Sequence, residues 1–263
     1  DEAVAELDPS DGDWVDGVEL RLDPDGNPVI ISTEFSPSPF FDYEENWLLH
    51  CNDPMCAGGD DVGVLIADAS PSPSDLTSSF AVDSIGHPAL ARKPAITLVR
   101  CDDPSCDGAI SGSEPSQLIP VAGPAQSVRL DPSGNPMLGY STGGGPGAVY
   151  CNDPLCADDD VIVTIPTSYQ AGSVIADVDG RGNPVIGWVD AEAGALLRVA
   201  RCVDQACTSA PVVTDLHYDN VGIGLIGLDI DPVTDHVTVA YRAGDPWADG
   251  NPFQIKVDRL AGS

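Results

Sequence analysis

The chain has 263 residues and a formal net charge of -31, from 42 Asp plus Glu against 11 Lys plus Arg. A negative field of this size repels nucleic acid and anionic lipid surfaces, so we expect neither as a partner. The hydrophobic fraction of 42% is enough for a packed core, which argues against disorder. No apolar run approaches the roughly 18 residues of a membrane-spanning helix.

A turn motif of the form Asp-x-x-Gly-Asn/His-Pro recurs along the chain. It occupies residues 23–28, 83–88, 131–136 and 179–184, with a degenerate fifth copy at 231–236. Apolar residues alternate on both sides of each copy, such as Val128 and Leu130 before the third turn and Met137 after it. This period of two is typical of half-buried strands. Glycine can adopt a positive φ in the turn and proline can open the next strand, so the motif predicts five β-hairpins.

All eight cysteines fall into four C-x4-C pairs at intervals of about 50 residues. The pairs are Cys51 and Cys56, Cys101 and Cys106, Cys151 and Cys156, and Cys202 and Cys207. This spacing fits a four-residue loop whose ends face each other within disulfide distance. Zinc tolerates the same spacing but needs two pairs to converge on one ion, whereas each pair here belongs to a separate repeat. We predict four local disulfides and therefore an oxidising, extracellular or cell-surface location.

Each repeat contains the elements of a four-stranded sheet. In the third copy the expected strands are 127–130, 137–141, 148–151 and 161–165. Four antiparallel strands in about 50 residues are typical of one β-propeller blade. We therefore predict an all-β, five-bladed propeller in a single domain, with blades at approximately 18–75, 76–125, 126–171, 172–220 and 221–263.

Both ends of this pattern need separate interpretation. The chain begins at Asp1 without a signal-like segment, which suggests a processed product. The N-terminal segment 1–8 contains a short apolar run at 3–7 that belongs to none of the five repeats. We expect this run to supply the missing outer strand of the last blade and so to close the ring. The first copy carries an insertion at 35–46, which places Phe40 and Phe41 on an exposed loop.

The chain resembles secreted bacterial β-propellers whose blades carry Gly-Asn-Pro hairpins and Cys-Asn-Asp-Pro-x-Cys loops. Cys51 to Cys56 and Cys151 to Cys156 reproduce that loop, and the resemblance covers about residues 18–259. It implies the propeller fold and a location outside the cell. It does not imply an activity, since propellers serve as hydrolases, lectins, scaffolds and adhesion modules.

Three aromatic residues are the candidate ligand-stacking groups. Tyr140, Trp188 and Tyr241 each lie five residues beyond the Asn or His of their turn. They could stack on sugar rings, but packing of one blade against the next is the favoured interpretation. Ser32 and Arg92 occupy the same position in the other two copies, which argues against a symmetric ring of sugar sites.

Carboxylates are abundant, but no set defines a metal or catalytic site. Asp23, Asp25 and Asn27, the pair Asp177 and Asp179, and the run 158–160 resemble parts of calcium loops, without the acid that ends a full loop. We prefer a turn-capping role for them, with weak divalent cation binding at most and no cofactor. Glu34 and Asp190 occupy equivalent positions and form the best pair for a glycoside hydrolase, a coincidence that 42 acids make common. We assign no catalytic residue.

Together these features favour a non-catalytic structural or interaction module that binds copies of itself, in a filament or layer, through propeller faces or Phe40 and Phe41. The alternatives are a carbohydrate-binding, lectin-like propeller and, less favoured, a glycoside hydrolase. The charge suggests a salty habitat, where ions screen the self-repulsion. The stretches 36–39 and 70–79 have the Ser/Thr/Pro composition of O-glycosylated segments, although plain exposed loops are the preferred interpretation.

Overall fold

A computed structural model describes residues 14–262, except 38–41, 58–60, 71–76, 93–96, 107–115, 119–124, 158–159, 168–170, 191–195, 219–222, 232 and 245–253. All the regular structure in this part of the chain is β-strand. Consistently, no described helix is long and apolar enough to cross a membrane. The chain divides into two compact units, 1–121 and 122–263, and each is described by itself.

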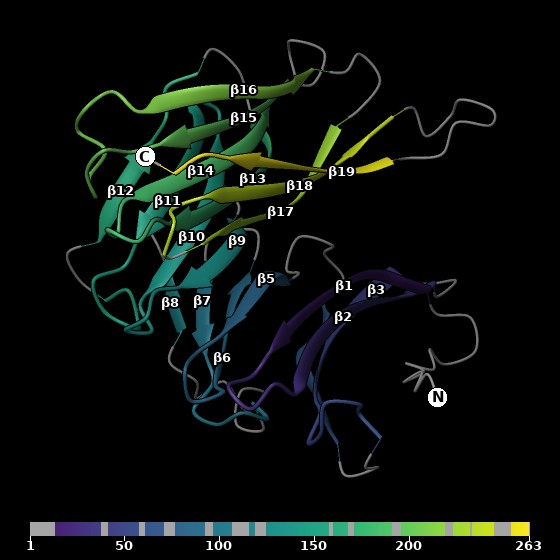
Figure 1. Cartoon of the computed structure of the whole chain (residues 1–263). Helices are drawn as coiled ribbons and strands as arrows, with labels where there is room; N and C mark the ends of the chain where they lie inside the picture. The colour runs from purple at the N-terminus through teal and green to yellow at the C-terminus, as the bar shows by residue number, and fades with distance from the viewer. Residues whose placement is uncertain are drawn as a thin grey trace. The chain divides into compact units, whose positions relative to one another are not determined.

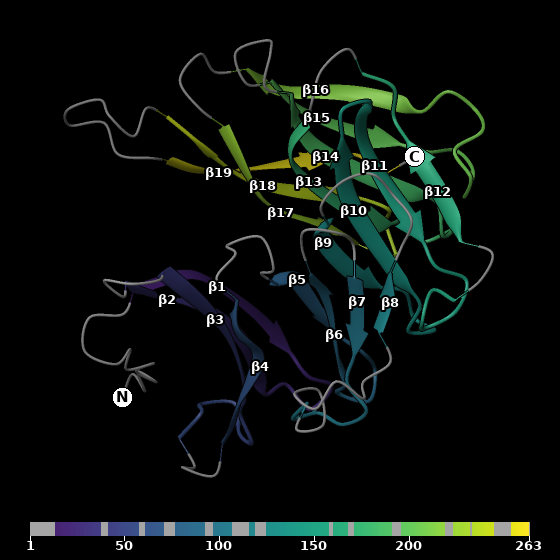
Figure 2. The ribbon, with the colours of Figure 1, turned by 180° about the vertical axis from the view of Figure 1, so that it is seen from behind.

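The first unit contains two four-stranded antiparallel sheets (Figures 1 and 2). One sheet has the order β1-β2-β3-β4, with β1 at Trp14–Leu22, β2 at Pro28–Pro37, β3 at Asp42–His50 and β4 at Val62–Ser70. The other has the order β5-β6-β7-β8, with β5 at Thr77–Val82, β6 at Pro88–Arg92, β7 at Thr97–Arg100 and β8 at Ser116–Leu118. Each strand pairs with its neighbour in the sequence, which is the connectivity of a propeller blade.

The second unit contains three sheets of the same kind (Figure 1). The third sheet consists of β9 (Ala125–Leu130), β10 (Pro136–Thr142), β11 (Gly145–Tyr150) and β12 (Val161–Thr164). The fourth consists of β13 (Ala171–Val178), β14 (Pro184–Asp190), β15 (Leu196–Arg201) and β16 (Val212–Tyr218). The fifth has three described strands, β17 (Ile223–Ile230), β18 (Val237–Ala243) and β19 (Gln254–Leu260).

The fold class is therefore an all-β, five-bladed β-propeller, as predicted. The apolar run at 3–7, expected to complete the fifth blade, lies outside the described residues. The second strand of each of the first four blades begins at the proline of its turn, at Pro28, Pro88, Pro136 and Pro184. The preceding glycines have φ between +81° and +92°, a region that strongly favours glycine. The longer fifth turn uses Asp235 at φ +54° instead.

The insertion at 35–46 is described in part, and Phe40 and Phe41, expected on an exposed loop, lie outside the described residues. Its ends continue the β2–β3 hairpin, in which Phe35 pairs with Glu44, Ser36 with Tyr43 and Pro37 with Asp42. Aromatic side chains favour extended strands, and the pairing is continuous from the core outward.

The hydrophobic core lies between neighbouring blades of each unit. In the first unit, Val29, Ile31 and Leu48 of the first blade pack with Phe80 and Leu90 of the second. In the second unit, one cluster joins the third and fourth blades and another joins the fourth and fifth. The turns and cysteine loops therefore lie at the ends of strands that this packing holds in place.

Candidate functional site

The four cysteine pairs are disulfides, as predicted. They join Cys51 to Cys56, Cys101 to Cys106, Cys151 to Cys156 and Cys202 to Cys207, with Cα–Cα distances of 4.8 to 5.0 Å. The amide of each first cysteine donates to the carbonyl of the proline that opens the second strand. Each loop is thus fixed next to the turn of its own blade.

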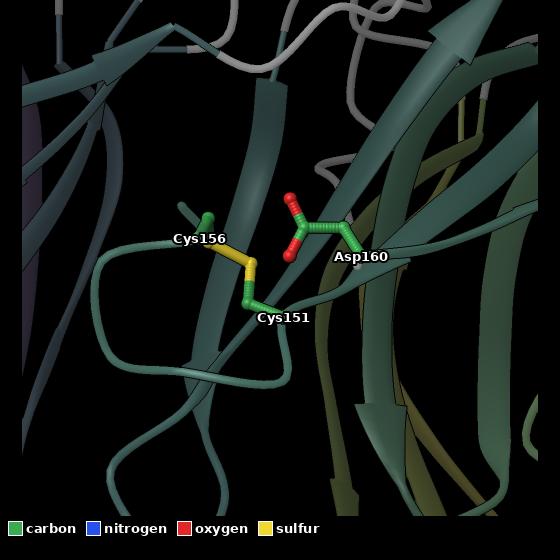
Figure 3. A group of neighbouring side chains, drawn as sticks. All are labelled: Cys151, Cys156 and Asp160. Atoms are coloured by element: carbon green, nitrogen blue, oxygen red, sulfur yellow. A yellow bond between two sulfur atoms is a disulfide. The ribbon is translucent and has the colours of Figure 1, made fainter. Parts of the chain in front are cut away.

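One of these disulfides lies beside a carboxylate. Ligand atoms of Cys151, Cys156 and Asp160 fall within 4.8 Å of one another, and Figure 3 shows the carboxylate facing the sulfur atoms. Zinc is bound by thiolates, and both sulfurs here are joined in the disulfide. This grouping is therefore a disulfide next to an acid, and it does not provide a zinc ligand set.

The aspartate that begins each turn holds the turn together. In the third copy, Asp131 Oδ1 accepts from the amides of Ser133 and Asn135 at 2.8 and 2.9 Å. Asp23, Asp83 and Asp179 accept the same two amide bonds in their copies. Burial alone would raise the pKa of Asp23, but hydrogen bonds from Asn27, His50 and Asp25 outweigh it, and the pKa is lowered. Bonds to these amides favour the ionised carboxylate.

A second set of aspartates fixes the cysteine loops. Asp53 Oδ1 accepts from the amide of Met55 at 2.7 Å and Oδ2 from Ala57 at 3.1 Å. Asp153 makes the equivalent pair of bonds, and Asp204 accepts from the amide of Thr208 at 2.9 Å. The sequence analysis did not single out these residues. Their constant place two residues after each first cysteine was the available signal.

The sequence analysis also missed the residue before each first cysteine, whose type differs among the four copies. It is a hydrogen-bond donor in all four copies: His50, Arg100, Tyr150 and Arg201. His50 Nε2, Arg100 Nη2 and the Tyr150 hydroxyl lie 3.0, 2.9 and 2.8 Å from Oδ2 of the turn aspartate of their own blade. A donor at one fixed position therefore connects the cysteine loop with the turn.

The three aromatic candidates are buried. Tyr140, Trp188 and Tyr241 are at most 2% exposed and pack in the cores of the second unit. The Tyr140 hydroxyl donates to Val163 O at 3.0 Å, and the Tyr241 hydroxyl donates to Asp258 Oδ2 at 3.0 Å. Among the described residues, Trp188 Nε1 has no hydrogen-bond partner. No sugar could stack on these rings without displacing the core around them.

The carboxylate candidates are dispersed. Asp190 is buried and paired with Arg198 at 2.8 Å, while the structure describes only the backbone of Glu34, in β2. Asp177 Oδ1 accepts from the amide of Val178 at 2.8 Å. Two acids of the run 158–160 lie outside the described residues, as do Phe40, Phe41 and most of the stretches 36–39 and 70–79. Arg198 also pairs with Asp215 at 2.9 Å, so Asp190 and Asp215 share one guanidinium group.

The described residues line a concave site in each unit. The first is a polar cleft of about 570 Å³ between the turns and cysteine loops of the first and second blades. The second is a hollow of about 350 Å³ at the junction of the fourth and fifth blades. Its polar lining is Asp179, Arg181, Asn183, Arg201 and Thr214, and the rest is Cys202, Val203, Val212, Leu260 and Ala261.

Comparisons with known proteins support the fold and leave the activity open. No family model and no curated protein matches the chain. A protein of unknown function from Dyadobacter fermentans is similar in structure, with a TM-score of 0.61 and 14% identity over 94% of this chain and 77% of that one. A leech intramolecular trans-sialidase, solved with 2,7-anhydro-Neu5Ac, matches at a TM-score of 0.45 and 14% identity. This chain spans 44% of the trans-sialidase, a likeness too distant to carry an argument. The class is thus a disulfide-bonded β-propeller.

Proposed function

We propose that this protein is a non-catalytic extracellular propeller that associates with copies of itself. The observation that carries the proposal is the hollow between the fourth and fifth blades. Arg181 and Arg201, two of only 11 basic residues, line it together with Asp179 and with apolar side chains. Val203 and Val212 in its wall are 58% and 60% exposed. A hollow with two arginines against one aspartate and an apolar wall, on a chain of charge -31, can accept an acidic segment that carries large apolar side chains.

The chain itself contains such a segment. Phe40 and Phe41 are followed by Asp42, Tyr43 and two glutamates. Insertion of this segment into the hollow of a second copy is a heterologous contact, because the two surfaces differ. Contacts of this kind produce rings when the rotation closes and filaments when it does not. The four disulfides agree with the oxidising exterior in which such an assembly would form.

Sedimentation velocity and negative-stain electron microscopy test this proposal over a range of protein and salt concentrations. We expect oligomers that increase with concentration, and with salt as screening weakens the repulsion between copies. Val212→Asp and the double change Phe40→Ser with Phe41→Ser should each leave monomers. Val233→Asp is the matched control, because Val233 is 90% exposed and lies outside the hollow. A wild-type protein that stays monomeric throughout, or equal disruption by Val233→Asp, would contradict the proposal.

A further inference from the structure

The residue before the first cysteine makes different contacts in different blades. The Tyr150 hydroxyl reaches the side chain of Gln205, in the cysteine loop of the following blade, besides Asp131. Arg201 donates to Asp235 O and Ala261 O of the following blade, both at 3.0 Å. These long side chains bridge their junctions. His50 is shorter, and its ring bonds to Asp23 in its own blade at 3.0 Å.

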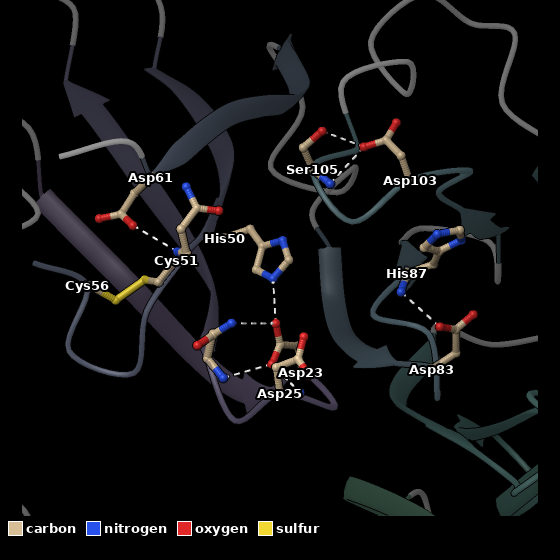
Figure 4. A network of polar contacts seen from close by, with 12 residues as sticks. Asp23, Asp25, His50, Cys51, Cys56, Asp61, Asp83, His87, Asp103 and Ser105 are labelled. Atoms are coloured by element: carbon tan, nitrogen blue, oxygen red, sulfur yellow. Dashed lines mark hydrogen bonds and ion pairs between the residues drawn. A yellow bond between two sulfur atoms is a disulfide. The ribbon is translucent and has the colours of Figure 1, made fainter. Parts of the chain in front are cut away.

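The polar cleft lies at this first junction. One wall carries Asp23, Asp25, Asn27, His50 and Asn52 of the first blade, and the other carries Ser84, Ile85 and Pro104 of the second. Figure 4 shows His50, Asp23 and Asp25 on one side and the Asp83 turn with the Ser105 loop on the other. A volume of about 570 Å³ is within the usual range of small-molecule sites, roughly 300 to 1,000 Å³.

The polar groups of this cleft suit hydroxyl groups better than a cation. Asp23 already accepts from two backbone amides, the Asn27 side chain and His50. Among the described residues, the one set of three groups close enough to hold a metal includes the Cys151–Cys156 disulfide and lies in the other unit. Asp25 adds an acceptor, Ser84 both a donor and an acceptor, and Asn52 an amide. A hydroxyl can both donate and accept, so a ligand with several hydroxyls can match this mixture.

The remaining lining is apolar and presented toward solvent. Pro24 and Pro104 supply proline rings, and Ile85 is 68% exposed. Such side chains can cover the C–H face of a pyranose while the polar groups bind its hydroxyls. An anionic sugar would meet the Asp25 carboxylate and the field of a strongly acidic chain. We propose that the cleft between the first and second blades binds a neutral pyranose, the end or a residue of an uncharged glycan.

Heteronuclear NMR of the intact, oxidised protein tests this site. The probes are the methyl glycosides of glucose, galactose and mannose, with methyl glucuronide as the anionic and glucosamine as the cationic comparison. At least one neutral glycoside should shift the signals of residues 23–27, the His50 ring and 84–86. Asp25→Ala should weaken binding about tenfold, as expected when a hydrogen bond to a charged group is lost.

A pair of matched variants separates a filled cleft from a damaged fold. Ile85→Trp should abolish the shifts by filling the cleft, whereas Val233→Trp, at the equivalent turn position of the fifth copy, should leave them unchanged. Ser133→Ala serves as the control for Asp25→Ala, since Ser133 has the same place in the third turn. Absence of shifts with every neutral glycoside would overturn the proposal. So would tighter binding of glucosamine or glucuronide, or binding that survives Ile85→Trp.

Discussion

Removal of one turn aspartate measures how strongly the turn and the cysteine loop of a blade depend on each other. Asp131 accepts four hydrogen bonds: the amides of Ser133 and Asn135 at 2.8 and 2.9 Å, the Asn135 side chain at 3.2 Å and the Tyr150 hydroxyl at 2.8 Å. Asp131→Ala removes all four. Hydrogen bonds to charged acceptors contribute about 1.5 to 3 kcal/mol each when buried, but water can replace part of these because the turn is half-exposed.

We therefore assign about 0.5 to 1 kcal/mol to each bond, and expect Asp131→Ala to lower the free energy of unfolding by about 2 to 4 kcal/mol. Tyr150→Phe removes one of the four and should cost about 1 kcal/mol. The double variant should cost less than the sum of the two, by about the value of the shared bond. Urea denaturation with the disulfides intact, followed by far-ultraviolet circular dichroism, measures all three differences.

The control must account for the charge that is lost with the carboxylate. Asp102 is exposed in the second cysteine loop, and Asp102→Ala changes the net charge by the same amount. It should leave stability unchanged, or raise it slightly by reducing the repulsion within the chain. If Asp131→Ala and Asp102→Ala have the same stability, the turn aspartates do not stabilise the blades in the way described.

Three further outcomes are expected. A Cβ on Gly139 would lie 3.0 Å from Ala176 N of the neighbouring blade. Gly139→Ala should therefore lower the free energy of unfolding, measured by urea denaturation, by about 1 to 3 kcal/mol. Gly143→Ala is the control and should lower it little, because a Cβ there has no atom within 4 Å. Burial and the hydrogen bond to Asp258 raise the pKa of Tyr241 to about 12. The neutral phenol therefore contributes stability that is complete below about pH 10 and is lost as pH rises through 12, a loss that Tyr241→Phe should reduce in alkaline denaturation. The melting temperature should rise between millimolar and molar NaCl, because about 0.1 M salt already screens exposed charges that are more than about 10 Å apart. A flat or falling melting temperature would leave the hydrogen bonds in the turns as the reason for the many aspartates.

The repeats were readable from the sequence because their chemistry is local. A glycine that needs positive φ, a proline that opens a strand and two cysteines five residues apart each act within one turn or loop. Gly134, Pro136 and the Cys151–Cys156 disulfide therefore occupy the predicted places. Burial alternates along β18, whereas β10 and β14 are buried on both faces, so the alternation marks the core side of only some strands.

The candidate sites depend on contacts between copies, which the repeat pattern does not encode. His50 and Tyr150 occupy equivalent positions, yet among the described residues the first bonds within its own blade and the second also reaches the next. A cleft of about 570 Å³ lies at the His50 junction, and a smaller hollow of about 350 Å³ lies at the junction that Arg201 bridges. The buried position of Trp188 was equally ambiguous in the sequence, because a ring at that point can face a ligand or a neighbouring sheet.

The shortness of the disulfide loops affects how the chain can oxidise. Eight cysteines can pair in roughly a hundred ways, and most of those pairings would link different blades. In this chain every native partner is five residues away, closer in sequence than any competitor. The correct partner is therefore also the most frequently encountered one in the unfolded chain, because short loops close at the lowest entropy cost. Oxidation can thus proceed blade by blade, and an added or deleted repeat would leave the pairing of the others unaltered.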